Sequence, residues 1–269
     1  MKRAVILKLG GELLEGADRL KAISKVIKLA AKTRPLIVVH GGGREIDASL
    51  AQVGIPKRQV DGLRVTDPET LDIVVSVLAG SINTRFVAAI NAVGGRAIGL
   101  TGADAGVAPV KKAALHKATS GDNVDLGQVG TPVANAPAPA LLALLCNAGY
   151  VPVIACVSAS KDGQLFNVNA DTLAGSLASR IKAKRLVIAG ATAGVLDKRG
   201  QTIPRLNKTH IAKLVTSGTA NAGMVAKLTA CEAALTGASS VVIIDGRDAK
   251  RIRKAVALQK TDATSRVVK

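Results

Sequence analysis

The sequence is poor in aromatic residues, with one Tyr, two Phe and no Trp among 269 residues. Base stacking on aromatic rings, which many single-strand nucleic-acid binders use, is hard to build from three such side chains. Hydrophobic residues still make up 48% of the chain, which excludes global disorder because a full core can be buried. That core must be aliphatic, built from Ala, Val, Leu and Ile.

Cysteine and histidine are also scarce. The three cysteines, Cys146, Cys156 and Cys231, form no CxxC pair and leave an odd number for a disulfide framework, so we expect free thiols in a reducing compartment. The three histidines show no metal-ligand spacing, and we expect no metal held by protein side chains alone. The GxxxxGK[ST] motif and a well-placed GxGxxG are missing, which excludes those two ways of holding a nucleotide.

The sequence contains no uninterrupted apolar run of membrane-spanning length. Its longest uncharged span, Leu126–Ser160, is interrupted by prolines, whereas a membrane helix needs about 20 continuous apolar residues. The opening residues MKRAVILKLGG hold only five apolar residues before Lys8, too few for a signal peptide. The sequence therefore predicts a cytoplasmic protein that does not associate with membranes.

Basic residues outnumber acidic ones by 37 to 19, which gives a net charge of +18. Such a charge suits nucleic acid, but it attracts small anions such as nucleotides and dicarboxylates equally well. The basic residues are dispersed except in segment 247–269, which has eight Lys or Arg against two Asp. We interpret RDAKRIRKAVALQK in this segment as a solvent-exposed helix face, and we favour small anions over nucleic acid as partners.

Short apolar runs alternate with longer helical stretches, and the length allows about 1.8 domains. The alternation predicts an α/β fold, a three-layer αβα sandwich with a mostly parallel central sheet. A seam near Val157–Gln164 separates the expected lobes 1–160 and 161–269. The expected strands are Ala4–Leu9, Leu36–His40, Arg96–Leu100, Val151–Ala155, Arg185–Ala189 and Ser240–Ile244. The expected helices are Asp18–Lys32, Glu45–Val53, Val74–Val93, Ala138–Ala148, Asp171–Lys182, Ile211–Val215, Met224–Leu235 and Ala249–Ala257.

Two glycine clusters follow expected strands, KLGG at Lys8–Gly11 and HGGG at His40–Gly43. In α/β sheets, ligands bind outside the carboxyl ends of the strands. Glycine lets backbone N–H groups approach an anion, and the following helix offers a positive N-terminus. One cluster alone would be explained by a tight turn, but two clusters with Lys8 before the first favour anion binding.

Two lysines and an aspartate stand near these turns. Lys8 ends an apolar strand, where a charge is costly to bury, and Lys227 stands near a helix N-terminus, where it opposes the dipole. Asp171 ends FNVNAD at a strand-to-helix junction, where Asp is also a common N-cap. Together the three suit phosphoryl transfer, with the lysines neutralising the transferring group and the aspartate holding them. A carboxylate acceptor needs no base, because a group of pKa about 4.3 is already ionised.

The motifs, taken in order, resemble those of the amino acid kinase family, and within it the kinases that phosphorylate N-acetyl-L-glutamate. The resemblance covers almost the whole chain, and GLRVTD together with NVNAD is its most specific part. The matching segments are KLGG, HGGG, DGLRVTD (61–67), GLTGADAG (99–106), DLGQVG (125–130), GYVPVIA (149–155), FNVNAD (166–171), GVLDKRG (194–200) and AGMVAK (222–227).

The resemblance implies an N-terminal lobe that binds N-acetyl-L-glutamate and forms a homodimer, and a C-terminal lobe that binds ATP. It implies that Lys8 and Lys227 stabilise the transition state, that Asp171 orients them, and that Mg²⁺ is held mainly through the nucleotide phosphates. Its implied acetylglutamate ligands are Gly42, Gly43, Arg64 and Asn167. Its implied nucleotide ligands are Gly10, Gly11, Gly194, Asn221 and Gly223, with the nucleotide against loops 191–196 and 219–224.

Arg64 also has a physical reason for this role, because a guanidinium pairs bidentately with a carboxylate, although a surface salt bridge would explain it as well. Arginine-inhibited relatives usually carry an extra N-terminal helix, whereas here the first expected strand begins by Ala4, so we expect no inhibition by arginine.

One departure from the family pattern is the sequence GATAGV at 190–195, where relatives usually read TDVPGV. The loop aspartate is missing, which puts one polar contact near the nucleotide in doubt. Two other hypotheses therefore stay open. One is a sister kinase acting on a carrier-linked acidic acceptor, and the other is a catalytically impaired basic binding protein that retains the kinase fold.

Overall fold

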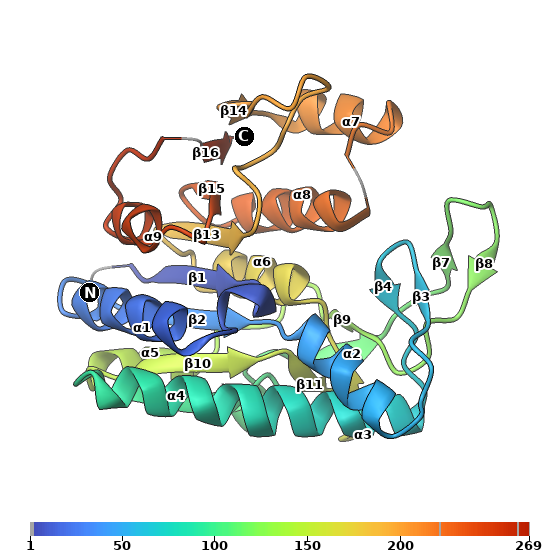
Figure 1. Ribbon diagram of the computed structural model, residues 1–269, viewed down its shortest axis with the longest axis horizontal. Coiled ribbons are helices and arrows are strands. Elements are labelled where there is room, and N and C mark those ends of the chain that lie inside the picture. The colour runs from blue at the N-terminus through green and yellow to red at the C-terminus, as the bar shows by residue number, and fades with distance from the viewer. Residues whose placement is uncertain (1–2, 221, 263, 269) are drawn as a thin grey trace.

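The computed structural model describes residues 3–220, 222–262 and 264–268. Its largest sheet has eight strands in the order β14-β16-β15-β13-β1-β2-β10-β5 (Figure 1). All neighbours are parallel except β15 and β16, so the prediction of a mostly parallel sheet is confirmed. The bounds are β1 Val5–Leu9, β2 Leu36–His40, β5 Ala97–Thr101, β10 Val151–Ala155, β13 Arg185–Gly190, β14 Arg205–Leu206, β15 Val241–Asp245 and β16 Thr264–Val267.

Helices cover both faces of this sheet, which gives the three expected layers. One layer holds α1 (Ala17–Ala31), α4 (Asn83–Ala92) and α9 (Ala249–Val256), with α1 packed between the other two. The opposite layer holds α5 (Ala140–Asn147), α6 (Ala170–Arg180) and α8 (Ala222–Leu235). The strands of the sheet centre are buried along their whole length, so they appear in the sequence as continuous apolar runs.

The helix predicted at Val74–Val93 begins earlier than expected, as one continuous stretch over Pro68–Ala92. Its parts are α3 (Pro68–Val75), a π-helical segment (Ser76–Ile82) and α4. Asp67 caps the start by accepting a hydrogen bond from the Thr70 N–H, and Pro68 occupies the first helical position.

Within the described ranges, Pro68–Ala92 is the one helix long and apolar enough to span a membrane by length and composition. Here its buried side chains, among them Leu78 and Phe86, pack into the core, and α4 contacts β5, β10 and α1.

Short hairpins were not predicted from the sequence. They pair β3 (Gln59–Val60) with β4 (Leu63–Arg64), β6 (Val110–Lys112) with β9 (Gly130–Pro132), β7 (His116–Lys117) with β8 (Asn123–Val124), and β11 (Val157–Ala159) with β12 (Leu165–Asn167). The β3–β4 and β7–β8 hairpins project beyond the carboxyl ends of the central strands (Figure 1). The expected lobe boundary falls on the β11–β12 hairpin, but the main sheet runs unbroken through both halves of the chain, and the division into lobes stays a prediction.

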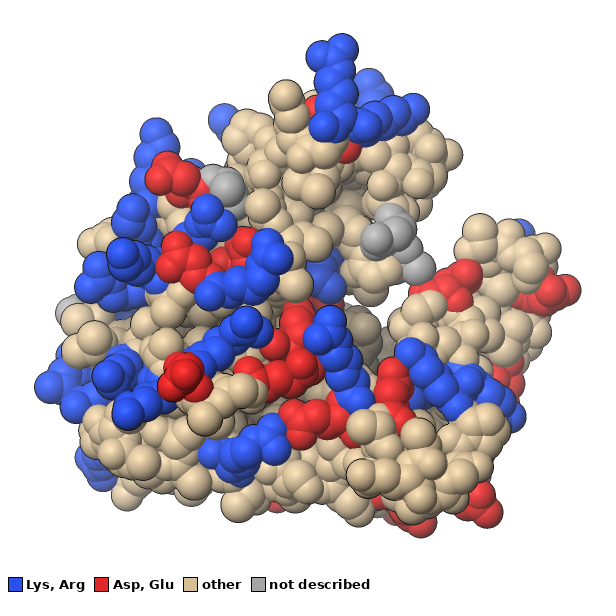
Figure 2. All heavy atoms as spheres, in the orientation of Figure 1, with Lys and Arg blue, Asp and Glu red and all other residues tan. Residues whose placement is uncertain are grey.

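The remaining helices are α2 (Gly43–Gln52) and α7 (Lys208–Thr216). On α9, Lys250, Arg253 and Lys254 are exposed while Ile252 is buried, as the interpretation of a solvated basic face requires. Figure 2 shows Lys and Arg spread over this side of the molecule with Asp and Glu between them. All three cysteines lie in the described part of the chain and are free thiols.

Candidate active site

The candidate site lies where the chain changes direction across the sheet. From β1 the chain first adds β2 on one side, and later adds β13 on the other side. Such a switch point leaves a crevice at the carboxyl ends of the two diverging strands, where α/β proteins bind ligands. Lys8 stands near the carboxyl end of β1, and Gly190 ends β13.

The two glycine clusters touch each other at this crevice. A Cβ on Gly11 would lie 2.6 Å from the Cα of Gly42, which real side chains never tolerate. A Cβ on Gly42 would lie 2.2 Å from Cδ1 of Ile82, whereas one on Gly43 would meet no atom within 4 Å. Gly11 is therefore needed for close backbone approach between the two clusters, Gly42 packs against the side chains of Ile82 and Leu78, and Gly43 opens onto free space.

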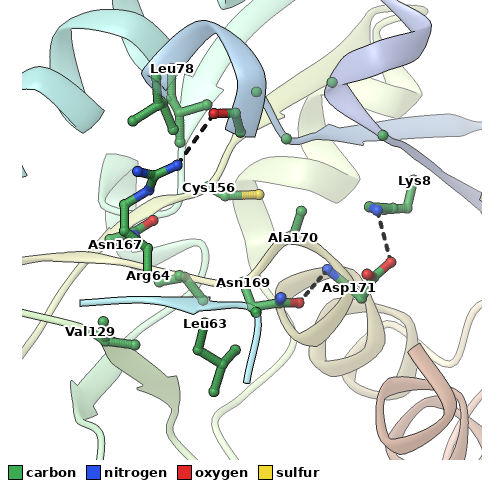
Figure 3. A pocket seen from close by; sticks show the side chains of 18 of the residues that line it. Lys8, Leu63, Arg64, Leu78, Val129, Cys156, Asn167, Asn169, Ala170 and Asp171 are labelled. Atoms are coloured by element: carbon green, nitrogen blue, oxygen red, sulfur yellow. Dashed lines mark hydrogen bonds and ion pairs between the residues drawn. The ribbon is translucent and has the colours of Figure 1, made fainter. Parts of the chain in front are cut away.

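Lys8 and Lys227 converge on a single carboxylate, that of Asp171. The Lys8 Nζ lies 2.9 Å from Oδ1, and the Lys227 Nζ lies 3.2 Å from Oδ2. The side chains of Lys8 and Asp171 are 6% and 5% exposed, and that of Lys227 is 22% exposed. Figure 3 shows Lys8 and Asp171 facing each other across the pocket wall. We call these three residues the ion triad; the sequence predicted its members, and the structure brings them together.

The charges of Lys8 and Asp171 keep each other ionised. Burial by itself would raise the pKa of Asp171, but the two ammonium groups outweigh it and hold that pKa below its ordinary value. Burial would likewise lower the pKa of Lys8, but Asp171 outweighs it and raises that pKa.

Asn169, rather than Asp171, caps helix α6. Its side-chain oxygen accepts hydrogen bonds from the N–H groups of Asp171 and Thr172, at 2.9 and 3.1 Å. The alternative that Asp171 is an N-cap is therefore wrong, because Asp171 lies two residues after the cap and its carboxylate points at the lysines. Its place in the first turn of α6 also suits a negative charge near the helix N-terminus.

Arg64 lies on β4 and reaches into the same pocket. Its side chain is 7% exposed, so the alternative of a surface salt bridge does not describe it. Its Nη2 contacts Asp47 and donates to the Gly43 carbonyl at 3.3 Å, while its Nη1 is buried and has no hydrogen-bond partner among the described residues. An orphaned buried guanidinium nitrogen is costly, so this atom is poised to receive an acceptor from a ligand.

Asn167 ends β12 beside Arg64 (Figure 3) and donates a hydrogen bond from Nδ2 to Oγ1 of Thr66 at 3.1 Å. His40 is buried beneath the second glycine cluster and contacts its backbone. Its Nδ1 pairs with the Gly41 carbonyl, and the Asn83 amide, which also donates to a strand carbonyl, lies 3.0 Å from its Nε2. Burial lowers the pKa of His40 to about 4, so the ring is neutral near pH 7 with both nitrogens engaged.

Lys8, Asp171, Arg64 and Asn167 line one pocket with a volume of about 240 Å³, whereas Lys227 contacts Asp171 from outside that lining. Drug-sized ligands occupy roughly 300–1,000 Å³, so this cavity fits a small acid and a terminal phosphate better than a whole nucleotide. It is lined by eight of the predicted site residues: Lys8, Gly10, Gly11, Gly42, Gly43, Arg64, Asn167 and Asp171.

Three predicted nucleotide ligands lie elsewhere. Gly194 adopts a positive φ of 83° and packs against Ser265 outside this pocket. Gly223 is exposed, and its carbonyl accepts a hydrogen bond from Lys227 at 3.4 Å. Asn221 lies outside the described residues.

The sequence reasoning missed other residues of the pocket, including Glu12, Leu63 and Asn169. The Asn169 cap could have been found, since Asn is as good a cap as Asp and precedes an apolar helix pattern. Nothing in the sequence signals that Leu63 lines the pocket, because the β3–β4 hairpin that carries it is too short to show a pattern.

Comparison with known proteins agrees with this geometry. The model of the amino acid kinase family matches residues 3–245. The chain therefore belongs to the amino acid kinase family.

Relatives of higher sequence identity identify one group of enzymes within this family. The acetylglutamate kinase of Aromatoleum aromaticum is 41% identical over 91% of this chain and 82% of its own length. That of Chromobacterium violaceum is 40% identical over 91% of this chain and 84% of its own length. Within the family, the chain thus groups with the acetylglutamate kinases.

Solved structures share the fold at lower identity. The N-acetylglutamate synthase of Neisseria gonorrhoeae, complexed with coenzyme A and N-acetyl-glutamate, superposes with a TM-score of 0.84 at 21% identity. The match covers 99% of this chain but only 59% of that longer chain. The carbamate kinase of Giardia lamblia bound to AMP-PNP gives a TM-score of 0.67 at 14% identity, over 99% of this chain and 98% of its own. These likenesses concern the fold alone.

Proposed function

We propose that the protein transfers the γ-phosphoryl group of ATP to the side-chain carboxylate of N-acetyl-L-glutamate, giving N-acetyl-L-glutamyl 5-phosphate in arginine biosynthesis. The observation that carries this proposal is the ion triad at the meeting point of the two glycine clusters. Lys8 and Lys227 bring two ammonium groups to one place, from segments more than 200 residues apart, and Asp171 holds both. Two positioned cations beside backbone N–H groups are what a transferring phosphoryl group requires.

The lysines and the aspartate of the ion triad have different roles in this reaction. Lys8 and Lys227 stabilise the negative charge that spreads over the equatorial oxygens of the migrating group. Asp171 is a positioning residue, because both its oxygens face ammonium groups. The acceptor is already ionised at neutral pH, so the reaction needs no general base. This agrees with His40, whose ring nitrogens are engaged by Gly41 and Asn83.

Arg64 is the residue we assign to the α-carboxylate of acetylglutamate. Its buried, unpartnered Nη1 offers a charge-assisted hydrogen bond inside the pocket. Asn167, the backbone of Gly42 and the open space at Gly43 would take the remainder of the substrate.

The nucleotide would lie with its phosphates on Gly10 and Gly11 and its nucleoside toward Gly194, Asn221 and Gly223. The described residues contain no group of three or more His, Cys, Asp or Glu that could hold a metal. A divalent cation such as Mg²⁺ therefore fits this site only when phosphate oxygens supply most of its ligands. When bound, it would neutralise charge on the phosphates.

Three further properties are part of the proposal. Residues 1–160 would bind acetylglutamate and form a homodimer, while residues 161–269 would bind ATP. The protein would work in the cytoplasm, where its free thiols stay reduced.

The direct test is detection of the acyl phosphate as a hydroxamate, with ATP and free acetylglutamate. Wild type should form product, and Lys8→Met should lose it while remaining folded. Arg64→Lys keeps the charge but loses the planar fork, so its KM for acetylglutamate should rise by about tenfold or more. Arg58→Lys is the matched control, because Arg58 is an exposed arginine, paired with Asp67, just before the same hairpin.

The same assay separates the alternatives. Product formed only with an acidic carrier-linked acceptor would favour the sister kinase. Ala191 favours the impaired binding protein, because the segment GATAGV at 190–195 contains no aspartate. If folded wild type forms no acetylglutamate-dependent product and binds nucleic acid in a salt-sensitive way, the impaired binding protein is favoured and the proposed kinase activity is rejected.

A further inference from the structure

Glu12 lies inside the active-site pocket although no step described so far uses it. It is the middle residue of the single 3-10 turn Gly11–Leu13, which follows β1. Its carboxylate folds back over the first glycine cluster, so that a Cβ on Gly10 would lie 2.3 and 2.4 Å from its two oxygens. Among the described residues, no side chain or N–H group makes an ion pair or hydrogen bond to this carboxylate.

The Glu12 carboxylate lies near Lys8 on one side and near Lys227 at the end of β13 on the other. Seen from a Cβ position on Gly190, its Oε1 is 3.7 Å away and Cε of Lys227 is 3.9 Å away, so both side chains flank the end of β13. Its charge also reaches Lys8 and helps to raise the pKa of that lysine. An unpaired carboxylate thus lies beside both lysines and beside the backbone turn proposed for the phosphates.

A carboxylate in this place opposes the proposed ligand unless something bridges them. It repels the phosphate oxygens at short range, in a partly buried setting where water screens poorly. A divalent cation removes the conflict, because carboxylate and phosphate oxygens are the ligands that Mg²⁺ prefers. Asp171 is poorly suited to this part, since each of its oxygens already faces an ammonium group.

We propose that Glu12 supplies the protein oxygen that binds the divalent cation of the bound nucleotide. This inference rests on the proposed kinase function and adds to it a residue that recognises the metal. One carboxylate is too few to bind the cation alone. The described part of the chain contains no group of three or more His, Cys, Asp or Glu that could hold a metal without the nucleotide. The metal therefore binds with the nucleotide and not before it.

The test measures nucleotide binding in the absence of acetylglutamate, so that no turnover is needed. AMP-PNP is titrated calorimetrically into wild type and Glu12→Gln, once with excess Mg²⁺ and once with EDTA. For Glu12→Gln, we expect affinity for the magnesium complex to fall by about tenfold, since a charge-assisted ligand is lost. Affinity for the metal-free nucleotide should rise, since a repulsive charge is gone.

Two further variants make the result specific. Asp18→Asn removes a negative charge from the exposed first turn of α1 and should change neither affinity. Glu12→Asp keeps a charge but shortens the reach, so it should lose magnesium-dependent binding while metal-free binding stays weak. Mn²⁺ replacing Mg²⁺ gives a second readout, because electron paramagnetic resonance of the bound complex should change in Glu12→Gln.

The test depends on Glu12→Gln weakening the binding of the magnesium complex while strengthening the binding of the metal-free nucleotide. If Glu12→Gln strengthens both forms, the carboxylate acts only by repulsion, and the inference is wrong. If it changes neither, Glu12 does not touch the nucleotide, and the inference is again wrong. Wild type that binds neither form would refute the proposed kinase function and this inference with it, whereas magnesium-dependent binding that Glu12→Gln leaves intact would refute this inference alone.

Discussion

Replacing Asp171 by Asn should cost more stability than any other single change within the ion triad. The substitution keeps the shape of the side chain but leaves Lys8 and Lys227 facing each other with no carboxylate between them. Lys8 is 6% exposed and cannot reach water, whereas Lys227 is 22% exposed and can swing outward. Removing one partner of a buried ion pair typically costs about 3–5 kcal/mol. We expect a loss of about 3 kcal/mol, because Lys227 can relieve part of the repulsion.

The response of Lys8 limits the loss further. In wild type its pKa is raised only because Asp171 outweighs the effect of burial. Without the Asp171 carboxylate, burial outweighs the smaller opposing effect of Glu12, so the pKa of Lys8 should fall below its ordinary value. The buried lysine then loses its proton more easily, which makes Asp171→Asn increasingly less damaging as the pH rises above neutrality.

The assay is a double-mutant cycle of urea unfolding with Asp171→Asn, Lys8→Met and the combined variant. At pH 7.5 both contributions are fully present. The lowered pKa of Asp171 gives stability that holds above about 3.9, its value in the unfolded chain, and the raised pKa of Lys8 gives stability that holds below about 10.4. The combined variant should lose less stability than the sum of the single losses, with a coupling energy of about 1–3 kcal/mol. Additive losses, or a cost below about 1 kcal/mol for Asp171→Asn, would refute the reasoning.

Two further predictions concern the glycine clusters and their support. The pKa of His40 is lowered to about 4, so the free energy of unfolding should fall by about 3 kcal/mol as the pH falls from 6.5 to 4. Urea midpoints measured at intervals of pH should show this slope in wild type and lose it in His40→Gln. An unchanged slope in the variant would contradict the burial of a neutral ring. Gly11→Ala should lower the free energy of unfolding by about 1–3 kcal/mol in thermal unfolding, because its Cβ meets backbone atoms. Gly43→Ala should keep the stability of wild type and raise KM for acetylglutamate. Equal stability of the two variants would show that the clusters do not touch.

The five inner strands β1, β2, β10, β13 and β15 could be predicted because they are buried on both faces, whereas the strands β14 and β16 were not predicted. Leu36–His40 and Val151–Ala155 are continuous apolar runs with the same bounds in sequence and structure. The hairpins could not be predicted, since β3 and β4 have two residues each and show no alternation. Their place is set by contacts with distant residues, such as the bond from Asn167 to Thr66 across 101 positions.

The ion triad could be predicted because costly placements stand out in a sequence. Lys8 interrupts an apolar strand and Lys227 opposes a helix dipole, so each needs a partner to offset it. Asn169 and Glu12 escaped notice because a polar residue next to a glycine or a helix start costs nothing locally. What makes Glu12 unusual is that its carboxylate, among the residues that the structure describes, has no ion-pair or hydrogen-bond partner although it lies in the active-site pocket, and only the folded arrangement reveals that.

The charges of the site also bear on the missing loop aspartate. Two ammonium groups and the two carboxylates of Asp171 and Glu12 cancel, so the phosphate end of the pocket is close to neutral before a ligand arrives. A metal-free triphosphate gains little from such a site, whereas a nucleotide that carries its cation can use the lysines and Glu12 at once. An additional aspartate at position 191 would tip this balance toward negative charge on the side of β13, beside the end that Glu12 already flanks. The alanine there is therefore compatible with an active kinase, because Glu12 already supplies a carboxylate on that side of the pocket.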